Sequence, residues 1–298
     1  MHSDIDRDII VRAKGLVKRF GDLTAVDGVD LEIGRGEIFG FLGPNGAGKT
    51  TTMRMVTTLT PPTEGTVEIC GHRLSGTADP VKDKIGIIQQ HIALDRDVTV
   101  RENIRYHAIL HRIPRREAES RIARLVSLMG LGPYMDKFVV DLSGGWKRRV
   151  AIVCAIIHQP EILFLDEPTA GLDTQSRHML WSLIRELNHE GTTIFLTTHY
   201  MDEAEELCDR VAIIDHGRTV RIGTPAQLCE SLGIWAVEYE VQGQKGFRYF
   251  SDWDGSRSFI DSLPKDTPTT SRKTNLEDVF LELTGRGTEV MEEVRFRV

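Results

Sequence analysis

The sequence predicts an α/β fold whose core is a largely parallel sheet. Short continuous apolar runs at Ile38–Leu42 and 162–165 have the length and composition of strands that are buried on both faces. From Gly144 onward, strand-like and helix-like patterns alternate along the chain, which is the order that βαβ units produce. The composition, 40% apolar and 27% charged over 298 residues, is close to that of an average soluble globular protein.

The N-terminal stretch from residue 9 to residue 33 is predicted to form strands, because apolar and polar side chains alternate along most of it. The run Ile38–Leu42 then leads into a glycine-rich loop. Residues 49–59 have a helical pattern that ends before Pro61 and Pro62. A strand, a loop and a helix in this order form one end of a βα unit.

The middle third is predicted to be helical. Thr99 is followed three positions later by Glu102, which is the pattern of a capping box, and the helix that it opens runs to His111. A second helix begins at Pro114 and ends at Gly130, with its apolar side chains along one face. These helices predict a helical insertion in the α/β protein.

Beyond Gly144 the pattern of strands and helices resumes. The elements expected there are the strand 162–165, the helix 176–189, the strand 193–197, the helix 201–207 and the strand 211–215. In the tail after Pro225, two strands and a short amphipathic helix are expected at 235–241, 247–250 and 275–283. We therefore expect a main domain over residues 9–230, with a helical subdomain over about 91–150, and a small α+β accessory region over 231–298.

Residues 43–50 read GPNGAGKT and fit the pattern G-x-x-x-x-G-K-[ST]. In such a loop the glycines allow successive backbone N–H groups to point inward and bind phosphate oxygens at the start of a helix. Lys49 is expected to reach the β- and γ-phosphates of a nucleotide, and the Thr50 hydroxyl to bind Mg²⁺. The residues expected to contact the nucleotide are Gly43, Pro44, Asn45, Gly46, Ala47, Gly48, Lys49, Thr50 and Thr51. Because a predicted strand precedes the loop and a predicted helix follows it, we interpret the loop as a nucleoside triphosphate site rather than a chance match.

Two acidic residues follow the second buried strand. Asp166 is expected to hold Mg²⁺ and its water shell, and Glu167 to accept a proton from the attacking water. Solvated acids at a strand end are the alternative interpretation, which the phosphate-binding loop makes less favourable. Together the two motifs are typical of P-loop NTPases, among them kinases, GTPases and helicases.

The charge balance and the cysteines argue against other classes of site. The chain carries 37 Lys and Arg against 44 Asp and Glu, a net charge of −7, which is a poor basis for a general nucleic-acid binder. The four cysteines are scattered without a C-x-x-C pair or a histidine cluster at metal-ligand spacing. We therefore expect reduced thiols of a cytoplasmic protein, with neither disulfides nor a zinc site.

No stretch of the sequence is expected to cross a membrane. The longest apolar run, at 150–157, falls short of the roughly 18 residues that a membrane-spanning helix needs. Residues 1–8 are polar and acidic and lack the apolar core of a secretory signal. We therefore expect a protein that stays in solution unless another chain holds it at a membrane.

Residues 142–146 read LSGGW and lie between the helical insertion and the acid pair. With this segment, the phosphate-binding loop and the acids in this order, the chain resembles the ATP-binding cassette (ABC) ATPases, whose signature is LSGGQ. The resemblance covers residues 9 to about 225. It implies the P-loop fold of the ABC ATPases and the hydrolysis of ATP. It places Ser143 and Gly145 at the γ-phosphate, and the signature residues that it implies for nucleotide binding are Ser143, Gly144 and Gly145.

One signature position departs from the family. Trp146 stands where the family usually has glutamine. Because the nucleotide-contacting positions are present, we expect this departure to alter the rate or the dimer geometry rather than the contact with ATP. The basic residues 147–149 that follow are expected to be solvated surface or to form local ion pairs.

The resemblance implies further site residues. Phe20 stands where the family has an aromatic side chain that stacks on adenine, and Gln90 where it has a glutamine that contacts Mg²⁺ and water, with the neighbouring Gln89 as the alternative. Residues 171–173 match the loop that couples the two sites of a dimer, and His199 matches the switch histidine. The catalytic residues implied are Gln90, Glu167 and His199, and the Mg²⁺ ligands implied are Thr50, Gln90 and Asp166.

The resemblance also implies an assembly. Two cassettes would pair head to tail, as a homodimer or with a related ATPase, and ATP and Mg²⁺ would lie between the phosphate-binding loop of one subunit and the signature of the other. Because the chain has one cassette and no expected membrane span, a separate permease is implied. That permease would hold the protein at the cytoplasmic face of the cell membrane.

Two segments, TTHYMDEAE at 197–205 and NLEDVFL at 275–281, resemble the bacterial drug-resistance exporters of the daunorubicin type, which work with small permeases of the ABC-2 type. The leading hypothesis is the ATPase subunit of an exporter of drugs, lipids or other amphiphiles. An importer ATPase subunit is the nearest alternative. The others are an ATP-regulated binding module, against which Glu167 argues, and a soluble ABC ATPase acting on ribosomes or DNA. The single cassette and the acidic charge argue against this last class, so no nucleic acid partner is expected.

Overall fold

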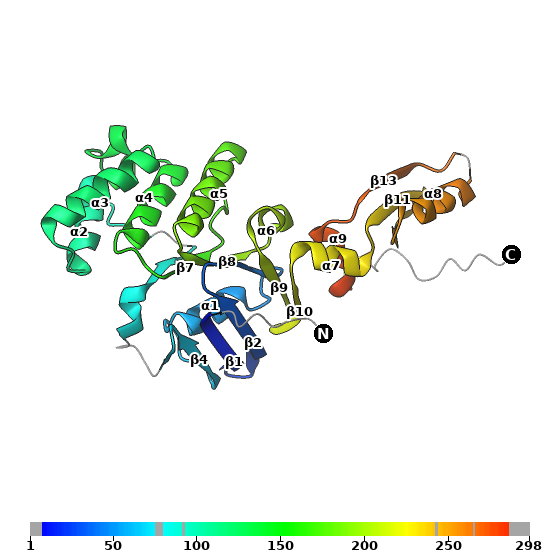
Figure 1. The fold of residues 1–298 in the computed structure, drawn as a ribbon, viewed down its shortest axis with the longest axis horizontal. Coiled ribbons are helices and arrows are strands. Elements are labelled where there is room, and N and C mark those ends of the chain that lie inside the picture. The colour runs from blue at the N-terminus through cyan, green and yellow to red at the C-terminus, as the bar shows by residue number, and fades with distance from the viewer. Residues whose placement is uncertain (1–7, 75–79, 91–92, 242–243, 265, 286–298) are drawn as a thin grey trace.

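The computed structural model describes residues 8–74, 80–90, 93–241, 244–264 and 266–285, in which a six-stranded sheet occupies the centre (Figure 1). Its strands lie in the order β10-β9-β3-β8-β7-β6. Their bounds are Arg218–Gly223, Arg210–Asp215, Ile38–Leu42, Thr193–Thr198, Ile162–Asp166 and Ile85–Ile88, in that order. Strands β9, β3, β8, β7 and β6 run parallel and β10 is antiparallel to β9, so the predicted α/β class with a largely parallel sheet is confirmed.

A four-stranded antiparallel sheet covers one face of the central sheet. It has the order β2-β1-β4-β5, with bounds Leu23–Gly34, Ile9–Phe20, Glu64–Ile69 and His72–Arg73. Its inward side chains enclose an apolar core together with helix α1 (Lys49–Val56) and the aromatic rings of the central strands, such as Phe39 and Phe195, whose centroids are 6.1 Å apart. Helix α1 ends earlier than residue 59, because Thr58 has a φ of 62° and leaves the helical conformation.

Helices cover the opposite face of the central sheet. The helices that pack on it are α4 (Gly144–Ile156), α5 (Thr174–His189) and α6 (Met201–Leu207), while α2 (Val100–Leu110) and α3 (Arg115–Leu128) lie further out against α4 (Figure 1). Short turns of 3-10 helix lie at η1 (Pro80–Lys84), η2 (Gly132–Tyr134) and η3 (Val139–Asp141). The Thr99 hydroxyl accepts from the Glu102 N–H and the Glu102 carboxylate from the Thr99 N–H, so the predicted capping box is confirmed.

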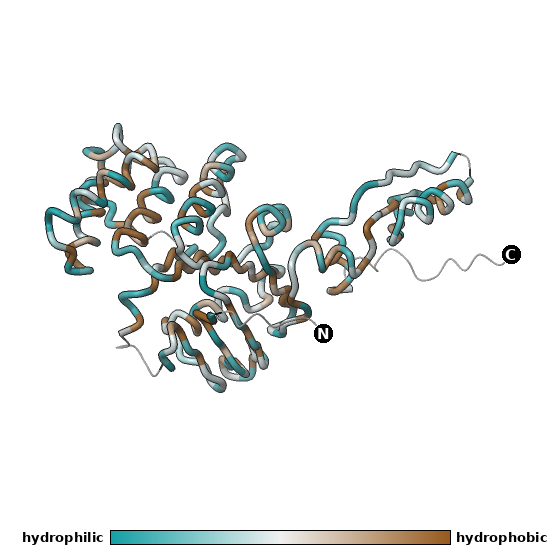
Figure 2. The backbone as a smooth tube through the Cα atoms, in the orientation of Figure 1, coloured by the Kyte–Doolittle hydropathy of each residue, from teal (hydrophilic) through white to brown (hydrophobic). Residues whose placement is uncertain are grey.

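The two apolar cores lie on the two faces of the central sheet. Figure 2 shows hydrophobic residues gathered along the central strands and on the insertion helices beside them. Strands β3, β7 and β8 are buried along their whole length, as expected for parallel strands covered on both faces. Among the helices of the described residues, none is long and apolar enough to span a bilayer.

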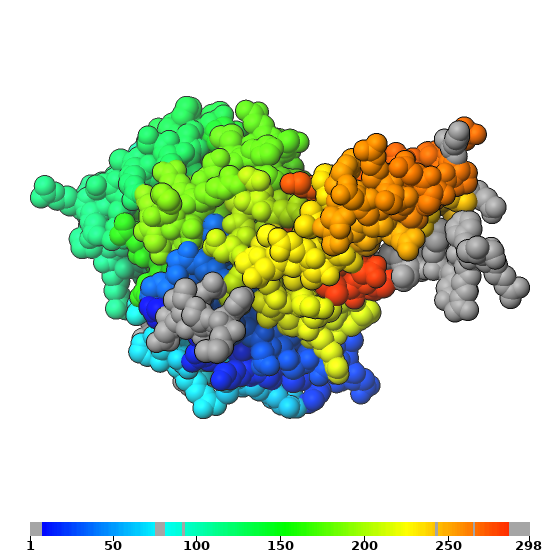
Figure 3. Space-filling model, turned by 45° about the vertical axis from the view of Figure 1, so that its right-hand side comes forward, coloured from blue at the N-terminus to red at the C-terminus, as the bar shows by residue number. Residues whose placement is uncertain are grey.

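The C-terminal part forms a small sheet that projects from the body of the molecule (Figures 1 and 3). Its elements are α7 (Pro225–Leu232), β11 (Trp235–Val241), β12 (Gln244–Phe250), α8 (Trp253–Ser262), β13 (Thr269–Lys273) and α9 (Leu276–Leu283), and the strand order is β12-β11-β13. Helix α8, which the sequence did not predict, packs on the sheet through ring contacts of Trp253 with Trp235 and of Phe259 with Tyr239. Helix α9 returns to the body and contacts α6 and α7, while the domain boundary at residue 230 stays a prediction.

A stacked pair of imidazoles lies in the groove between α2 and the central sheet. The ring centroids of His111 and His158 are 3.8 Å apart and their planes differ by 3°. His158 Nε2 lies 3.1 Å from the Ile85 carbonyl oxygen and donates its proton there, whereas its buried Nδ1 has no partner among the described residues. Burial, followed by the neighbouring His111, lowers the pKa of His158 to about 4.

This arrangement predicts a loss of stability in acid. Between the ordinary imidazole pKa of 6.5 and about 4, the unfolded chain binds a proton at His158 that the folded protein does not, so the free energy of unfolding falls as the pH falls through this window. His158→Gln keeps an N–H donor but does not titrate. We expect this variant to lose about 1 kcal/mol less than the unchanged protein when the pH drops from 7.5 to 5.5. Urea unfolding followed by circular dichroism at both pH values measures this, and equal losses would contradict it.

Candidate functional site

The phosphate-binding loop lies between β3 and α1, at the carboxyl end of the central strands. Gly46 and Gly48 have φ values of 83° and 105°, which residues with a Cβ rarely adopt. A Cβ on Gly48 would come within 2.7 Å of the Ala25 carbonyl oxygen, and a Cβ on Gly43 within 2.4 Å of the Ile214 carbonyl oxygen. Backbone conformation therefore requires glycine at 46 and 48, and close packing requires it at 43 and 48.

Lys49 is the first residue of α1 and crosses this loop, with only 4% of the residue exposed. Its Nζ donates to the carbonyl oxygens of Gly43 at 2.8 Å and Pro44 at 3.1 Å, and lies 3.4 Å from Glu167 Oε1. Burial lowers the pKa of Lys49, and the Glu167 carboxylate opposes part of this effect. The loop thus holds a cation at its mouth, where phosphate oxygens can bind it.

Three oxygen-bearing side chains meet at the end of β7. Asp166 Oδ1 accepts from the Thr50 hydroxyl at 3.2 Å and from the Thr197 hydroxyl at 2.6 Å. Asp166 is 4% exposed, so the two hydroxyls provide most of its hydrogen bonding. One carboxylate beside a neutral hydroxyl fits Mg²⁺, which proteins bind through one or two carboxylates plus substrate phosphates. Thr197 was not among the predicted site residues, although it lies only two positions before the predicted His199.

Glu167 stands at the centre of the site. Its Oε1 lies 3.2 Å from His199 Nδ1, in addition to the Lys49 contact, and its Oε2 accepts from Gln90 Nε2 at 3.4 Å. Its φ of 46° is uncommon for a residue other than glycine and costs about 1–3 kcal/mol. The backbone N–H of Glu167 donates to the Thr197 hydroxyl at 3.1 Å, which helps to hold this conformation. These contacts orient the Glu167 carboxylate in the pocket, where it is the group placed to take a proton from a bound water.

These side chains surround one open pocket of about 500 Å³. Its lining residues are Ala25, Asn45, Gly46, Gly48, Lys49, Thr50, Thr51, Gln90, Glu167, Ala170 and His199. The Gln90 side chain lines it, whereas Gln89 offers its backbone carbonyl to Arg148. Phe20 does not line it, but at the end of β1 the residue is 53% exposed, so its ring can stack on a ligand.

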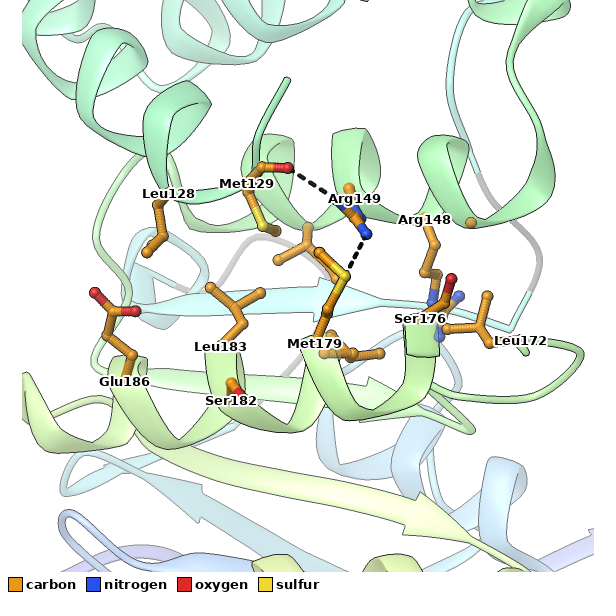
Figure 4. Close-up of a pocket in the computed structure, with 13 residues that line it drawn as sticks. Leu128, Met129, Arg148, Arg149, Leu172, Ser176, Met179, Ser182, Leu183 and Glu186 are labelled. Atoms are coloured by element: carbon orange, nitrogen blue, oxygen red, sulfur yellow. Dashed lines mark hydrogen bonds between the residues drawn. The ribbon is translucent and has the colours of Figure 1, made fainter. Parts of the chain in front are cut away.

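The signature residues Ser143, Gly144 and Gly145 are also absent from this lining and lie at the first turn of α4. Ser143 is the N-cap residue of α4, yet its side chain makes no capping hydrogen bond. Ser143 and Gly144 are exposed, and Gly145 borders a different cavity, between α4 and α5 (Figure 4). The structure of one chain therefore does not bring the signature and the phosphate-binding loop together.

The expectation that residues 147–149 are solvated surface or form local ion pairs is wrong for Arg148, which is 5% exposed and bonds to backbone carbonyls. Its guanidinium donates to four backbone carbonyls, those of Gln89 at 2.7 Å, Pro168 at 3.1 Å, Asp166 at 3.2 Å and Glu167 at 3.4 Å. Burial lowers the pKa of Arg148 to about 10, so the side chain stays charged at neutral pH. Arg148 lies four residues before the buried Ile152 and therefore on the same face of α4. This spacing could have predicted that Arg148 is buried, but sequence analysis did not use it.

Comparison with known proteins adds independent information. The model of the ABC transporter family matches residues 26–170. The Nod factor export ATP-binding protein I of Ralstonia nicotianae is 38% identical, over 93% of this chain and 94% of that protein. The daunorubicin/doxorubicin resistance ATP-binding protein DrrA of Streptomyces peucetius is 43% identical, over 75% of this chain and 68% of that protein.

Solved structures agree with these relatives. The ATP-binding subunit of an ABC transporter aligns with a TM-score of 0.71 at 26% identity, covering 92% of this chain and 99% of that one. A dimeric ATP-binding cassette in a post-hydrolysis state, bound to ADP and Pi, aligns with a TM-score of 0.66 at 28% identity, covering 72% of this chain and 98% of that one. The resemblance found in the sequence is therefore confirmed. The chain belongs to the ABC transporter family, as an ATP-binding cassette that hydrolyses ATP.

Proposed function

We propose that this chain is the ATPase subunit of an exporter, which hydrolyses ATP with Mg²⁺ in a head-to-tail pair of cassettes and drives a separate permease of the ABC-2 type. The observation that carries the proposal is the convergence of Lys49, Gln90 and His199 on the Glu167 carboxylate, each within 3.4 Å. The names of the two relatives, one for Nod factor export and one for drug resistance, support export of drugs, lipids or other amphiphiles.

The predicted site residues in and beside the pocket have proposed roles. Lys49 and the backbone N–H groups of the loop bind the phosphates, and Phe20 stacks on the adenine. Glu167 accepts a proton from the attacking water, while Gln90 and His199 orient that water and the γ-phosphate. The residues proposed to hold Mg²⁺ are Thr50, Gln90 and Asp166. When bound there, Mg²⁺ would neutralise charge on the phosphates, as in other P-loop enzymes.

The second half of each site comes from another subunit in this proposal. Ser143, Gly144 and Gly145 are exposed or half-buried at the first turn of α4 and lie outside the pocket of their own chain. In a head-to-tail pair they would meet the γ-phosphate held by the partner subunit. ATP then shifts the equilibrium toward the closed pair, and hydrolysis removes the phosphate that joins the two subunits.

An apolar surface on the helical insertion supports a permease partner. Tyr106, Ile109 and Leu110 are 61%, 70% and 56% exposed on α2, although the opposite side of that helix is already packed in the core. A groove of about 310 Å³ runs beside α2 and is bordered by Gln89. An exposed apolar patch of this kind marks an interaction surface. We place the permease's cytoplasmic helices there, which would hold the chain at the cytoplasmic face of the membrane.

Purification of the tagged chain from detergent-solubilised native membranes tests the partner. We expect a multi-helix membrane protein to come along in equal amount and to be identified by mass spectrometry. A co-purified solute-binding protein would instead support an importer. A chain that purifies alone, or with ribosomes or DNA, would contradict the transporter assignment. The ATPase activity would then serve another process.

Glu167→Gln tests the proposed base. The amide keeps the shape of the side chain but cannot accept the proton, so we expect hydrolysis to fall about 100-fold or more while ATP binding persists. ATP should also trap a dimer of this variant, detectable by light scattering after size-exclusion chromatography. Glu230→Gln, an exposed position on α7, is the matched control and should hydrolyse ATP at the normal rate. Unchanged hydrolysis in Glu167→Gln would show that another group accepts the proton.

Lys49→Ala tests the phosphate-binding loop. Removing a buried ammonium that binds phosphate oxygens should cost about 1.5–3 kcal/mol of binding free energy, so the Kd for ATP should rise about tenfold or more. Isothermal titration calorimetry with ATP measures the change, with Lys14→Ala on the exposed side of β1 as the control. Tight ATP binding after Lys49→Ala would remove Lys49 from the proposed site.

A further inference from the structure

Trp146, the residue that replaces the usual glutamine of the signature, does not point into empty space. Its ring packs against Tyr134 of η2, with the centroids 4.1 Å apart and the planes 31° from each other. The guanidinium carbon of Arg149, on the same helix α4, lies 4.2 Å from the Trp146 ring centroid. Trp146 therefore connects the turn before the signature to a cation one turn further along the helix.

Arg149 extends this connection to two other helices. Its Nη1 donates to the Met129 carbonyl oxygen at the end of α3, at 3.2 Å, and its Nη2 lies 3.0 Å from Met179 Sδ on α5. Figure 4 shows Arg149 between these two methionines, with both contacts drawn. Burial lowers the pKa of Arg149, and a partly desolvated cation interacts more strongly with an aromatic face. We call Tyr134, Trp146, Arg149 and Met179 the signature strap.

The signature strap spans a place where α4 and α5 do not pack tightly. A cavity of about 230 Å³ lies between the two helices and is bordered by Gly145, Arg149, Ser176 and Met179 among others (Figure 4). This pocket is partly open to solvent, and Met179 at its border is 44% exposed. The signature strap crosses from α4 to α5 at this place through the contact of Arg149 Nη2 with Met179 Sδ. The Trp146 ring packs against the Arg149 guanidinium on one side and against Tyr134 of η2 on the other, so it helps to position the side chain that makes this contact.

This location matters because both helices begin at predicted contact points of the dimer. The first turn of α4 carries Ser143 and Gly145, and α5 begins directly after the 171–173 loop, with Asp173 as its N-cap residue. A shift of about 1 Å in a reacting geometry can cost about 100-fold in rate. The ATP pocket of the same chain is lined by none of the strap residues.

We propose that Trp146 is a positioning residue for ATP hydrolysis, whose stack with Tyr134 and Arg149 fixes the signature turn relative to α5 so that it can close on the nucleotide of a second subunit. This inference rests on the proposed head-to-tail pair. A glutamine at this position has no ring to stack on Tyr134 or to receive the Arg149 guanidinium, so the strap is a consequence of the departure from LSGGQ.

The test separates positioning from nucleotide binding and from folding, using the full-length chain. Trp146→Ala should lower kcat about tenfold, since the signature turn is no longer fixed. The Kd of the single subunit for ADP, measured by calorimetry, should stay unchanged. Combined with Glu167→Gln, the alanine should weaken ATP-driven dimerisation in light scattering. Trp146→Phe keeps a stacking ring and should recover most of kcat.

Two further variants complete the test, the first as a control and the second as an independent change in the signature strap. Trp253→Ala removes a tryptophan that also packs against another ring, that of Trp235, but lies in the C-terminal accessory region, so it should leave kcat unchanged. Arg149→Lys keeps the charge but loses the planar guanidinium that contacts Met129 and Met179, so it should lower kcat even if Trp146→Ala fails to fold.

Normal kcat and dimerisation in Trp146→Ala would overturn the inference. It would also be overturned if Trp146→Phe were as impaired as the alanine variant, or if ADP affinity fell in step with kcat, because a general folding defect would then explain the loss. Failure of Glu167→Gln alone to dimerise with ATP would instead contradict the paired cassette itself, and the inference with it.

Discussion

The parallel pairing of β3 with β8, and of β8 with β7, is the constraint on which the rest of the molecule depends. Leu42 pairs with Thr198 and Asp166 pairs with Thr197, so the phosphate-binding loop, the acid pair and His199 all leave the sheet at one edge. A slip of one residue in either pairing would turn the side chains of a strand to the opposite face. The continuous burial of these three strands on both faces gives the pairing its stability, because their apolar side chains fill the two cores.

The buried guanidinium of Arg148 joins this edge to the helical insertion. The carbonyls at the ends of β6 and β7 have no further strand to pair with, and an unsatisfied buried carbonyl costs about 1–3 kcal/mol. Arg148 satisfies those of Gln89, Asp166, Glu167 and Pro168 from the second turn of α4. A cation so deeply desolvated stays in place because each of its three nitrogens donates to at least one carbonyl oxygen. The same helix that carries the signature therefore also supports the backbone under Glu167.

The sequence predicted the parts of the fold and site that depend on local patterns. The phosphate-binding loop, the capping box at Thr99 and the buried strands are encoded by residues close together in the chain, and each lies where it was expected. The contacts of Arg148 join segments that lie far apart in the sequence, so a run of three basic residues suggested a solvated surface instead. The signature strap was missed for a similar reason, since Tyr134, Trp146 and Met179 come together only when three helical segments pack. Helix α8 is short, and its sequence, WDGSRSFIDS, is so polar that it could not be distinguished from a loop.

Helix α9 packs back against the cassette, although it follows the projecting C-terminal sheet in the chain. The chain leaves the body after α7, builds the projecting sheet, and then comes back, where the Leu276 N–H donates to Glu205 of α6. Leu276, Val279 and Phe280 are buried in the same core as Leu207 and Leu228. The projecting sheet is thus tethered at both ends to the cassette, and its final helix is part of the cassette's own interior. Loss of α9 would therefore expose the apolar side chains of α6 and α7 that it covers, such as Leu207 and Leu228.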